Sequence, residues 1–304
     1  MGLEFLKKYY LSKFTNKSTK AKLSLKPFNT VGIGVTFSPN LKANVYEAAR
    51  LSLMFNSKLI LIHVGEKSSD KEAQFYSILE PFTKDNLEVE IVFQSGNPVE
   101  VILSTSEEKK IDLLILGALQ RENFLKYYVG SIARKITRQA KCSILLLIKP
   151  SVERVPCEHI VVNGLKDPKT QETIASAFYI ANALKSDKVT IVEEITQDEL
   201  AIKVEDDKTL RMATIVKERI KLRENARVKA IIEDIPEAYT KDIAIKSQPI
   251  FGTKGYSIGH YAQIARADLL IMNSPSKMTF WDRLFPHDIE HILTELPTDV
   301  LIIQ

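Results

Sequence analysis

The chain has little cysteine, no long apolar run and little net charge outside its first residues, and each absence excludes a class of protein. Its 304 residues include two cysteines, Cys142 and Cys157, which are too few for a disulfide framework and are typical of a reducing compartment. No apolar run approaches the roughly 18–20 residues of a membrane span. Residues 1–26 show neither a sustained apolar core nor a small-residue cleavage site, so we expect no signal peptide and a cytoplasmic protein.

The formal charge of +4 is concentrated in a basic N-terminal arm, residues 1–26, which holds seven lysines and one acid. The remainder has 35 basic and 37 acidic side chains, so we do not expect the body to bind nucleic acid. Leu3, Leu6, Tyr10 and Phe14 share one helical stripe of the arm. We interpret the arm as a solvated tail or a short docked helix, and contact with an anionic membrane is the alternative.

An internal repeat divides the rest of the chain. At an offset of about 156 residues, Gly96 aligns with Gly252, and Asp112–Ile115 aligns with Asp268–Ile271. The front parts of the two copies align at a smaller offset, about 127–130 residues, so the second copy carries an insertion near 200–240. We expect the insertion to be a longer crossover helix with a solvated charged face, and a partner-binding helix is the alternative.

Apolar segments rich in Val, Ile and Leu alternate with helical patterns in both copies. The expected strands of the first copy are 30–36, 58–64, 87–93, 112–116 and 143–148. Those of the second copy are 159–162, 188–192, 243–247, 268–272 and 299–303. In the first copy the expected helices are 41–55, 69–84, 98–108 and 130–140. The pattern predicts an α/β protein with two tandem five-stranded open parallel-sheet domains, 27–150 and 155–304, joined by a short linker at 150–156.

A candidate phosphate loop lies in the first copy. Ligands bind at the carboxyl ends of parallel strands, which here are Thr36, Val64 and Gly117. Twelve residues separate Gly117 from Gly130, and Gly130 and Ser131 open a helix, where free N–H groups and a partial positive charge suit an anion.

The second copy has lost this chemistry. Asn273 replaces the first glycine, and Pro286-His287 replaces the pair before the helix. Proline removes an N–H that a phosphate would need, so we expect no nucleotide there. The segment His287–His291 has the H-x-x-E-H spacing of some zinc sites, but too little chain follows to supply a third ligand, and we predict no metal site.

The chain resembles the universal stress protein family over 30–148 and 157–304. The resemblance rests on the strand order, on Gly96-Asn97-Pro98, on Asp112–Gly117 and on the Gly-Ser pair. ATP-binding members have the pattern Gly-x2-Gly-x9-Gly-(Ser/Thr) and an Asp at the end of the first strand. Gly117, Gly130 and Ser131 match, whereas Gln120 stands at the second glycine and Thr36 at the Asp.

The resemblance implies a Rossmann-like, adenine nucleotide alpha hydrolase-like fold and a site for ATP, with Mg²⁺ accompanying it. Gly117, Gly130 and Ser131 would then line the triphosphate, with Val64 near the base. Family members pair through their last strands, so the resemblance also implies an internal pseudo-dimer in which Ser143–Ile148 pairs antiparallel with Asp299–Ile303.

We therefore expect a stress-response protein that binds or senses adenine nucleotide in its first domain and acts on unidentified protein partners. The alternative is a nucleotide-free pseudo-dimeric scaffold, which Gln120 and Thr36 favour. A third hypothesis is that the protein is an enzyme. It would be at most a slow ATPase, because the sequence has no Walker lysine and no recognisable acid–base pair.

Overall fold

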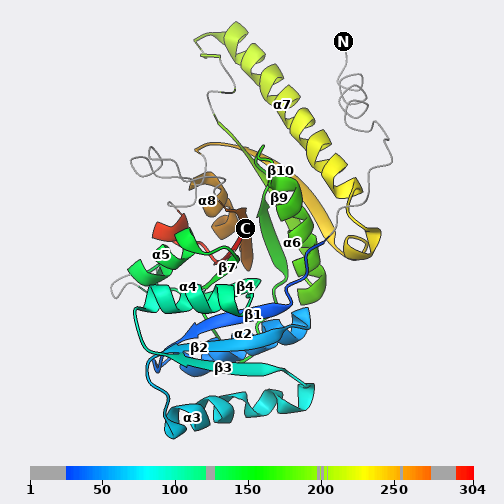
Figure 1. Ribbon diagram of the computed structural model, residues 1–304. Coiled ribbons are helices and arrows are strands. Elements are labelled where there is room, and N and C mark those ends of the chain that lie inside the picture. Colours follow the sequence, from blue (N-terminus) through cyan, green and yellow to red (C-terminus); the bar gives the residue numbers. More distant parts are fainter. Residues whose placement is uncertain are drawn as a thin grey trace.

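The computed structural model describes residues 25–120, 127–196, 199, 202–203, 205–253, 256–274 and 292–304. Ten strands form one continuous sheet (Figure 1). The first half contributes β1 (Thr30–Val35), β2 (Lys58–Val64), β3 (Val89–Gln94), β4 (Leu113–Gly117) and β7 (Ser143–Leu147). The second half contributes β8 (His159–Asn163), β9 (Lys188–Ile195), β10 (Ala244–Phe251), β11 (Leu269–Asn273) and β12 (Asp299–Ile303). Most of the N-terminal arm and the His287–His291 segment lie outside the described residues.

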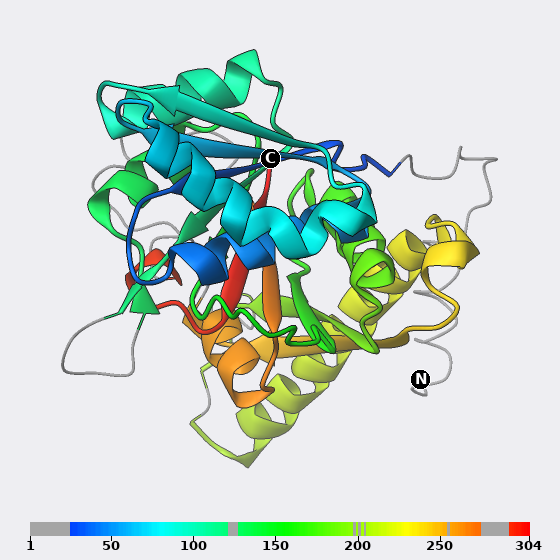
Figure 2. The same cartoon turned by 90° about the horizontal axis from the view of Figure 1, so that it is seen from below.

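The spatial order of the strands is β10-β9-β8-β11-β12-β7-β4-β1-β2-β3. Neighbouring strands within each half are parallel, and β7 and β12 are antiparallel, with Leu145 opposite Leu301 and Leu146 opposite Val300. Figure 2 shows the first half in blue and cyan on one side and α7, α8 and β10 of the second half on the other. The mixed α/β fold with an open, largely parallel sheet is confirmed.

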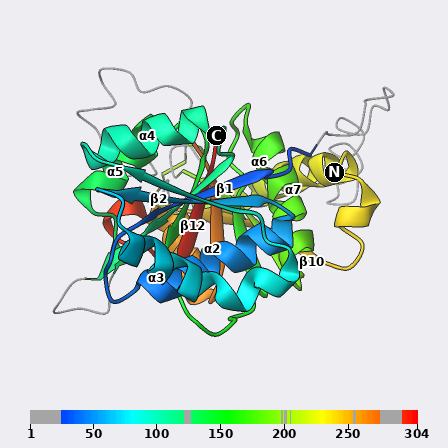
Figure 3. The same cartoon turned by 60° about the horizontal axis from the view of Figure 1, so that its bottom comes forward.

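Helices cover both faces of the sheet, which explains why its central strands are apolar on both sides. One face carries α2 (Leu41–Phe55), α3 (Ser69–Leu79), a 3₁₀ turn η1 (Glu80–Asp85), α6 (Thr170–Leu184), α7 (Asp207–Glu233) and a 3₁₀ turn η3 (Glu237–Tyr239). The other face carries α4 (Pro98–Glu108), α5 (Ser131–Gln139) and α8 (Tyr256–Ile264). In Figure 3, α4 and α5 lie on one side of the sheet, and α2 and α3 lie on the other.

The two halves also meet through helices α2 and α6. The ring of Tyr179 on α6 lies 5.9 Å from the ring of Phe55 on α2 and 6.0 Å from that of Phe28. Aromatic pairs at this spacing contribute beyond their buried area. The contact between the halves therefore includes a strand pair and an aromatic cluster on one face.

The repeated aspartate of the sequence has the same structural role in both halves. Asp112 Oδ2 accepts hydrogen bonds from the backbone N–H groups of Asn29 (2.8 Å) and Thr30 (3.0 Å). Asp268 Oδ2 accepts them from Glu158 and His159, both at 2.9 Å. In each half the carboxylate fixes the start of the first strand beside the fourth.

Several boundaries differ from those expected. The helix predicted over 69–84 ends at Leu79 and continues as the 3₁₀ turn η1, because Pro81 cannot donate the helical hydrogen bond. The strand expected at 243–247 is longer, Ala244–Phe251, because it pairs with β9 along its whole length. Within the described part of the chain, no helix is long and apolar enough to cross a bilayer.

The insertion expected near 200–240 forms the helix α7, Asp207–Glu233. Asp206 and Thr209 form a reciprocal capping box at its start. Val228, near its C-terminal end, is fully buried in the cluster beneath α6 and α7. The helix thus connects β9 to β10, with one side packed against the core and most of its first half exposed.

Candidate functional site

Three of the predicted site residues of the first half lie at one edge of the sheet. Thr36 follows β1, Val64 ends β2 and Gly117 ends β4. Because β1 lies between β2 and β4, these three strands present adjacent carboxyl ends. The chain leaves β1 toward β2 on one side, and β4 lies on the other side, so this edge contains the topological switch point at which open α/β sheets bind ligands.

The end of β4 faces a polar side chain that the sequence motif did not include. A side chain at position 117 would place its Cβ 3.6 Å from Asn44 Oδ1 and 3.7 Å from Asn44 Nδ2. Asn44 lies on the first turns of α2, and its Oδ1 is buried without a hydrogen-bond partner among the described residues. An unpaired buried acceptor is costly, so this amide is poised for a ligand or a water molecule.

The start of α5 is open to an anion. Gly130 is the N-cap residue, and no side chain caps the helix. Ser131, the first helical residue, is exposed, and the first turn contains no acid. The first N–H groups of a helix have no partner within the helix and carry partial positive charge, and Lys135 on the next turn adds a cation.

A short β ribbon that the sequence did not reveal links Gly117 to this helix start. Its strands are β5 (Leu119–Gln120) and β6 (Tyr127–Tyr128), which pair antiparallel. Gln120, which stands where the family pattern has glycine, pairs through its backbone with Tyr127. Its side chain and residues 121–126 lie outside the described residues.

The same segment is hydrogen-bonded to the second half of the chain. Val129 N donates to Leu293 O (3.0 Å), and Leu296 N donates to Tyr127 O (2.9 Å). The backbone directly before α5 is thus held on both sides, by the ribbon and by residues near the C-terminus.

His63 lies beneath this edge among aromatic rings. Its Nδ1 is 3.2 Å from Val35 O, and its ring centroid is 4.9 Å from that of Phe37 and 5.6 Å from that of Phe93. The side chain is 7% exposed. These contacts fit a structural histidine, and in the described part of the chain no three His, Cys, Asp or Glu side chains gather as a metal site.

The corresponding edge of the second half is filled by charged side chains from α7. Arg227 donates from its guanidinium to the carbonyl of Gly164, which directly follows β8. Glu224, 2% exposed, forms ion pairs with Lys166, Arg223 and Arg227. Burial alone would raise the pKa of Glu224, but the hydrogen bonds from these cations outweigh it and hold the pKa below its usual value.

Further acids at this edge disfavour a phosphate. Glu193, at 2% exposure, accepts a hydrogen bond from Ser247 (3.0 Å), and burial raises its pKa to about 7. Glu194 accepts one from the backbone N–H of Ile258 near the start of α8 (2.7 Å). Asn273, at the position equivalent to Gly117, donates to Thr170 Oγ1 (3.0 Å). Side chains of the protein thus fill the edge of the second half that corresponds to the ends of β1, β2 and β4 in the first half.

Comparison with known proteins places these sites in a family context. Residues 73–147 match the sequence model of the universal stress protein family. A curated universal stress protein of Methanocaldococcus jannaschii is 31% identical over 58 residues, which are 19% of this chain and 34% of that relative. The match therefore spans about a third of the relative's length.

Solved structures match over nearly the whole chain. A protein of unknown function from Pseudomonas aeruginosa has a TM-score of 0.66 at 16% identity, covering 91% of this chain and 92% of its own. A universal stress protein from Archaeoglobus fulgidus has a TM-score of 0.62 at 14% identity, covering 92% and 99%. At these identities the similarity shows the fold.

Proposed function

Since the chain belongs to the universal stress protein family, we propose that its first half binds an adenine nucleotide and that the protein acts through contacts with partner proteins. The observation that carries the proposal is the start of α5, where no side chain caps the helix and the first turn itself holds no acid, and which the β5–β6 ribbon links to the end of β4. A triphosphate at this edge would accept hydrogen bonds from the backbone N–H groups of Gly130 and Ser131.

The remaining residues of the edge take supporting roles. The carboxamide of Asn44 beside Gly117 offers a further polar contact, and its buried Oδ1 gains the partner that it lacks. Val64, partly buried at the end of β2, would lie near the base, and Thr36 would lie near the ribose. Mg²⁺ would enter with the triphosphate.

We further propose that the two halves are tandem copies with different tasks. The first half keeps an open helix start, and the second half fills its own edge with the Glu224–Arg227 network. One nucleotide per chain is then expected.

The first experiment asks whether the purified protein carries nucleotide. Denaturation should release ATP or ADP into the supernatant, where ion-exchange chromatography identifies it, at up to one molecule per chain. A chain that is empty after purification, gives no heat on titration with millimolar ATP and shows no thermal shift would contradict the proposal.

Ser131→Pro is the decisive variant. Proline is favoured at the first position of a helix, and Gly130 already has ψ 164°, so the change removes one N–H and one hydroxyl without breaking α5. Loss of a hydrogen bond to a charged group costs about 1.5–3 kcal/mol, or roughly 10- to 150-fold in the Kd for ATP. Ser131→Ala keeps the N–H and should lose less.

Asp207→Pro is the matched control, because it makes the same change at the first residue of α7, away from the site. Its Kd for ATP should equal that of the wild type, measured by isothermal titration. Equal binding by Ser131→Pro would show that the start of α5 does not hold the phosphates.

A further inference from the structure

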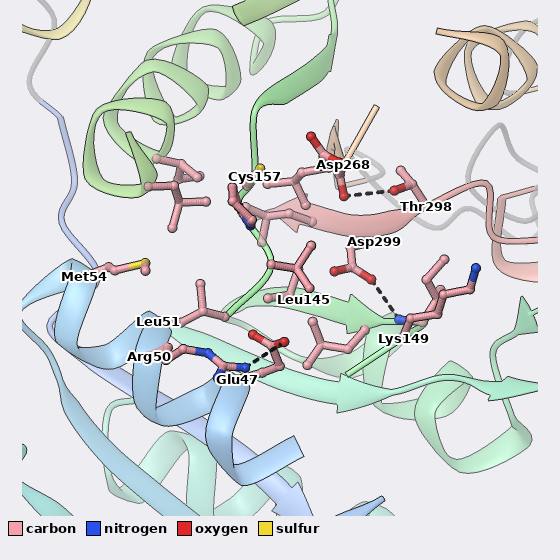
Figure 4. A pocket seen from close by; sticks show the side chains of 18 of the residues that line it. Glu47, Arg50, Leu51, Met54, Leu145, Lys149, Cys157, Asp268, Thr298 and Asp299 are labelled. Carbon is pink, nitrogen blue, oxygen red and sulfur yellow. Dashed lines mark hydrogen bonds and ion pairs between the residues drawn. The ribbon is translucent and has the colours of Figure 1, made fainter. Parts of the chain in front are cut away.

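A cavity of about 420 Å³ lies between the two halves, on the face of the sheet that carries α2 and α6 (Figure 4). Side chains from both halves line it, together with the linker that joins them. The main contributors are Leu51 and Met54 of α2, Leu145 of β7, Leu184 of α6, and Asp299 and Leu301 of β12. The cavity therefore exists only because the halves are joined in this arrangement.

The cavity is separate from the candidate nucleotide site. Leu145 and Leu301 belong to the core cluster beneath α2 and α6, whereas the buried Ile136 of α5 belongs to the cluster on the opposite face. The sheet itself thus separates the cavity from the helix that would hold phosphate. A ligand of the cavity would be a second ligand of this protein.

Size and lining suit an apolar small molecule. Pockets for small molecules typically measure about 300–1,000 Å³ and are lined by apolar side chains with few polar groups. An apolar cavity of about 150 Å³ accommodates one benzene ring. The volume here is nearly three times larger, which leaves room for two or three rings.

Most polar groups around the cavity are already engaged. Glu47 and Arg50 form an ion pair at 3.0 Å. Arg50 also donates to Val152 O (2.6 Å), and Glu47 accepts from Ser151 N (3.1 Å). These contacts fix the linker across α2. Asp268 accepts two backbone hydrogen bonds at the start of β8, as described above.

Asp299 is a buried acid of the lining with remaining hydrogen-bonding capacity. Its Oδ1 accepts one hydrogen bond, from Ile148 N (2.8 Å), whereas a carboxylate offers about four acceptor positions. Burial, aided by the charges of Glu47 and Asp268, raises the pKa of Asp299 to about 7. A donor from a ligand would stabilise the charged form of this carboxyl, which lies among apolar side chains.

Cys157 belongs to the apolar part of the wall. Burial raises the pKa of its thiol to about 12, so the thiol stays protonated and is a poor nucleophile. Covalent capture of a ligand is therefore not part of the chemistry of this cavity.

We propose that the cavity between the two halves binds an uncharged apolar molecule of two or three rings that carries one hydrogen-bond donor, and that this donor points at Asp299. Leu51, Met54, Leu145 and Leu184 contact the rings. The class comprises aromatic amines and aromatic alcohols, and the site is a junction between halves, so its occupant would contact both of them.

The test uses the full chain and N-phenyl-1-naphthylamine, an uncharged three-ring amine whose fluorescence rises in apolar surroundings. The wild type should bind it saturably. Met54→Trp fills the cavity and should weaken binding at least ten-fold. Leu53→Trp is the matched control, because Leu53 is the neighbouring, partly buried residue of α2 that does not line the cavity, and it should bind as the wild type does.

Leu184→Trp fills the cavity from α6 and replaces Met54→Trp if that variant does not fold, which its thermal melt would reveal. Asp299→Asn should weaken binding of the amine several-fold and leave unchanged the binding of 2-phenylnaphthalene, which has similar rings and no donor. The proposal is overturned by the absence of saturable binding, by unchanged binding in a folded filling variant, by displacement of the amine by ATP, or by equal effects of Asp299→Asn on both compounds.

Discussion

Asp299→Asn is expected to remove about 2 kcal/mol of a pH-dependent loss of stability from this protein. The wild-type carboxyl is held among apolar side chains at the junction of the halves, where burial raises its pKa from 3.8 to about 7. Asparagine has nearly the same shape, and its Oδ1 can still accept the hydrogen bond from Ile148 N. The substitution therefore changes the titration and leaves the packing nearly intact.

The sign follows from the proton balance of the two states. Between about pH 4 and pH 7 the folded protein keeps the proton of Asp299, while the unfolded chain has released it, so the free energy of unfolding falls as the pH rises. A shift of about three units corresponds to about 4 kcal/mol once the pH is well above 7, and about half of this loss is already present at about pH 5.5. The wild type should thus lose about 2 kcal/mol between about pH 5.5 and pH 8 through this group alone.

Urea unfolding at a series of pH values measures the effect. The Asp299→Asn curve should be flatter than that of the wild type by about 2 kcal/mol over this interval. Asp299→Asn should still show a residual slope of the free energy of unfolding against pH, because burial also raises the pKa of Glu193 to about 7. The double variant Asp299→Asn/Glu193→Gln should therefore give a flatter curve than Asp299→Asn alone. Asp242→Asn, at an exposed carboxylate, is the control. The reasoning is refuted if Asp299→Asn has the same pH dependence as the wild type within about 0.5 kcal/mol.

Two further predictions concern the frame of the sheet. Leu145→Asp places a charge opposite Leu301 in the β7–β12 pair, at a cost of about 3 kcal/mol or more in the free energy of unfolding. Calorimetry should then show a melting temperature lower by roughly 6 °C or more. An unchanged melting temperature would contradict a role for this contact in stability. Asp112→Ala and Asp268→Ala each remove two charge-assisted hydrogen bonds at the start of a strand. Each should lower the free energy of unfolding in urea by about 1.5–3 kcal/mol. A large difference between the two variants would contradict their structural equivalence.

The pattern of apolar residues was sufficient to predict the fold class. Near-continuous Val, Ile and Leu segments predict strands buried on both faces, and helices do cover both faces. The boundaries predicted from the sequence were less accurate where one residue decided the end of a helix, as at Pro81, or where pairing extended a strand, as in Ala244–Phe251.

The site was only partly predictable, because its missing parts depend on tertiary contacts. The β5–β6 strands are two residues long and have no periodicity to detect. Asn44 belongs to no motif, and only the packing of α2 against the end of β4 brings it to Gly117. The cavity at Asp299 likewise arises from how two halves pack, which no local pattern encodes.

The two halves differ at this edge of the sheet by more than the loss of a glycine. In the second half, Arg227 of α7 lies 63 residues from Gly164 in the chain, and its guanidinium donates a hydrogen bond to the Gly164 carbonyl. Glu224 forms an ion pair with the same guanidinium. The second half also contacts the first through the hydrogen bonds that link Leu293 and Leu296 to the backbone before α5. The start of α5 is therefore held in part by the second half, whose own corresponding edge is filled by side chains of the protein.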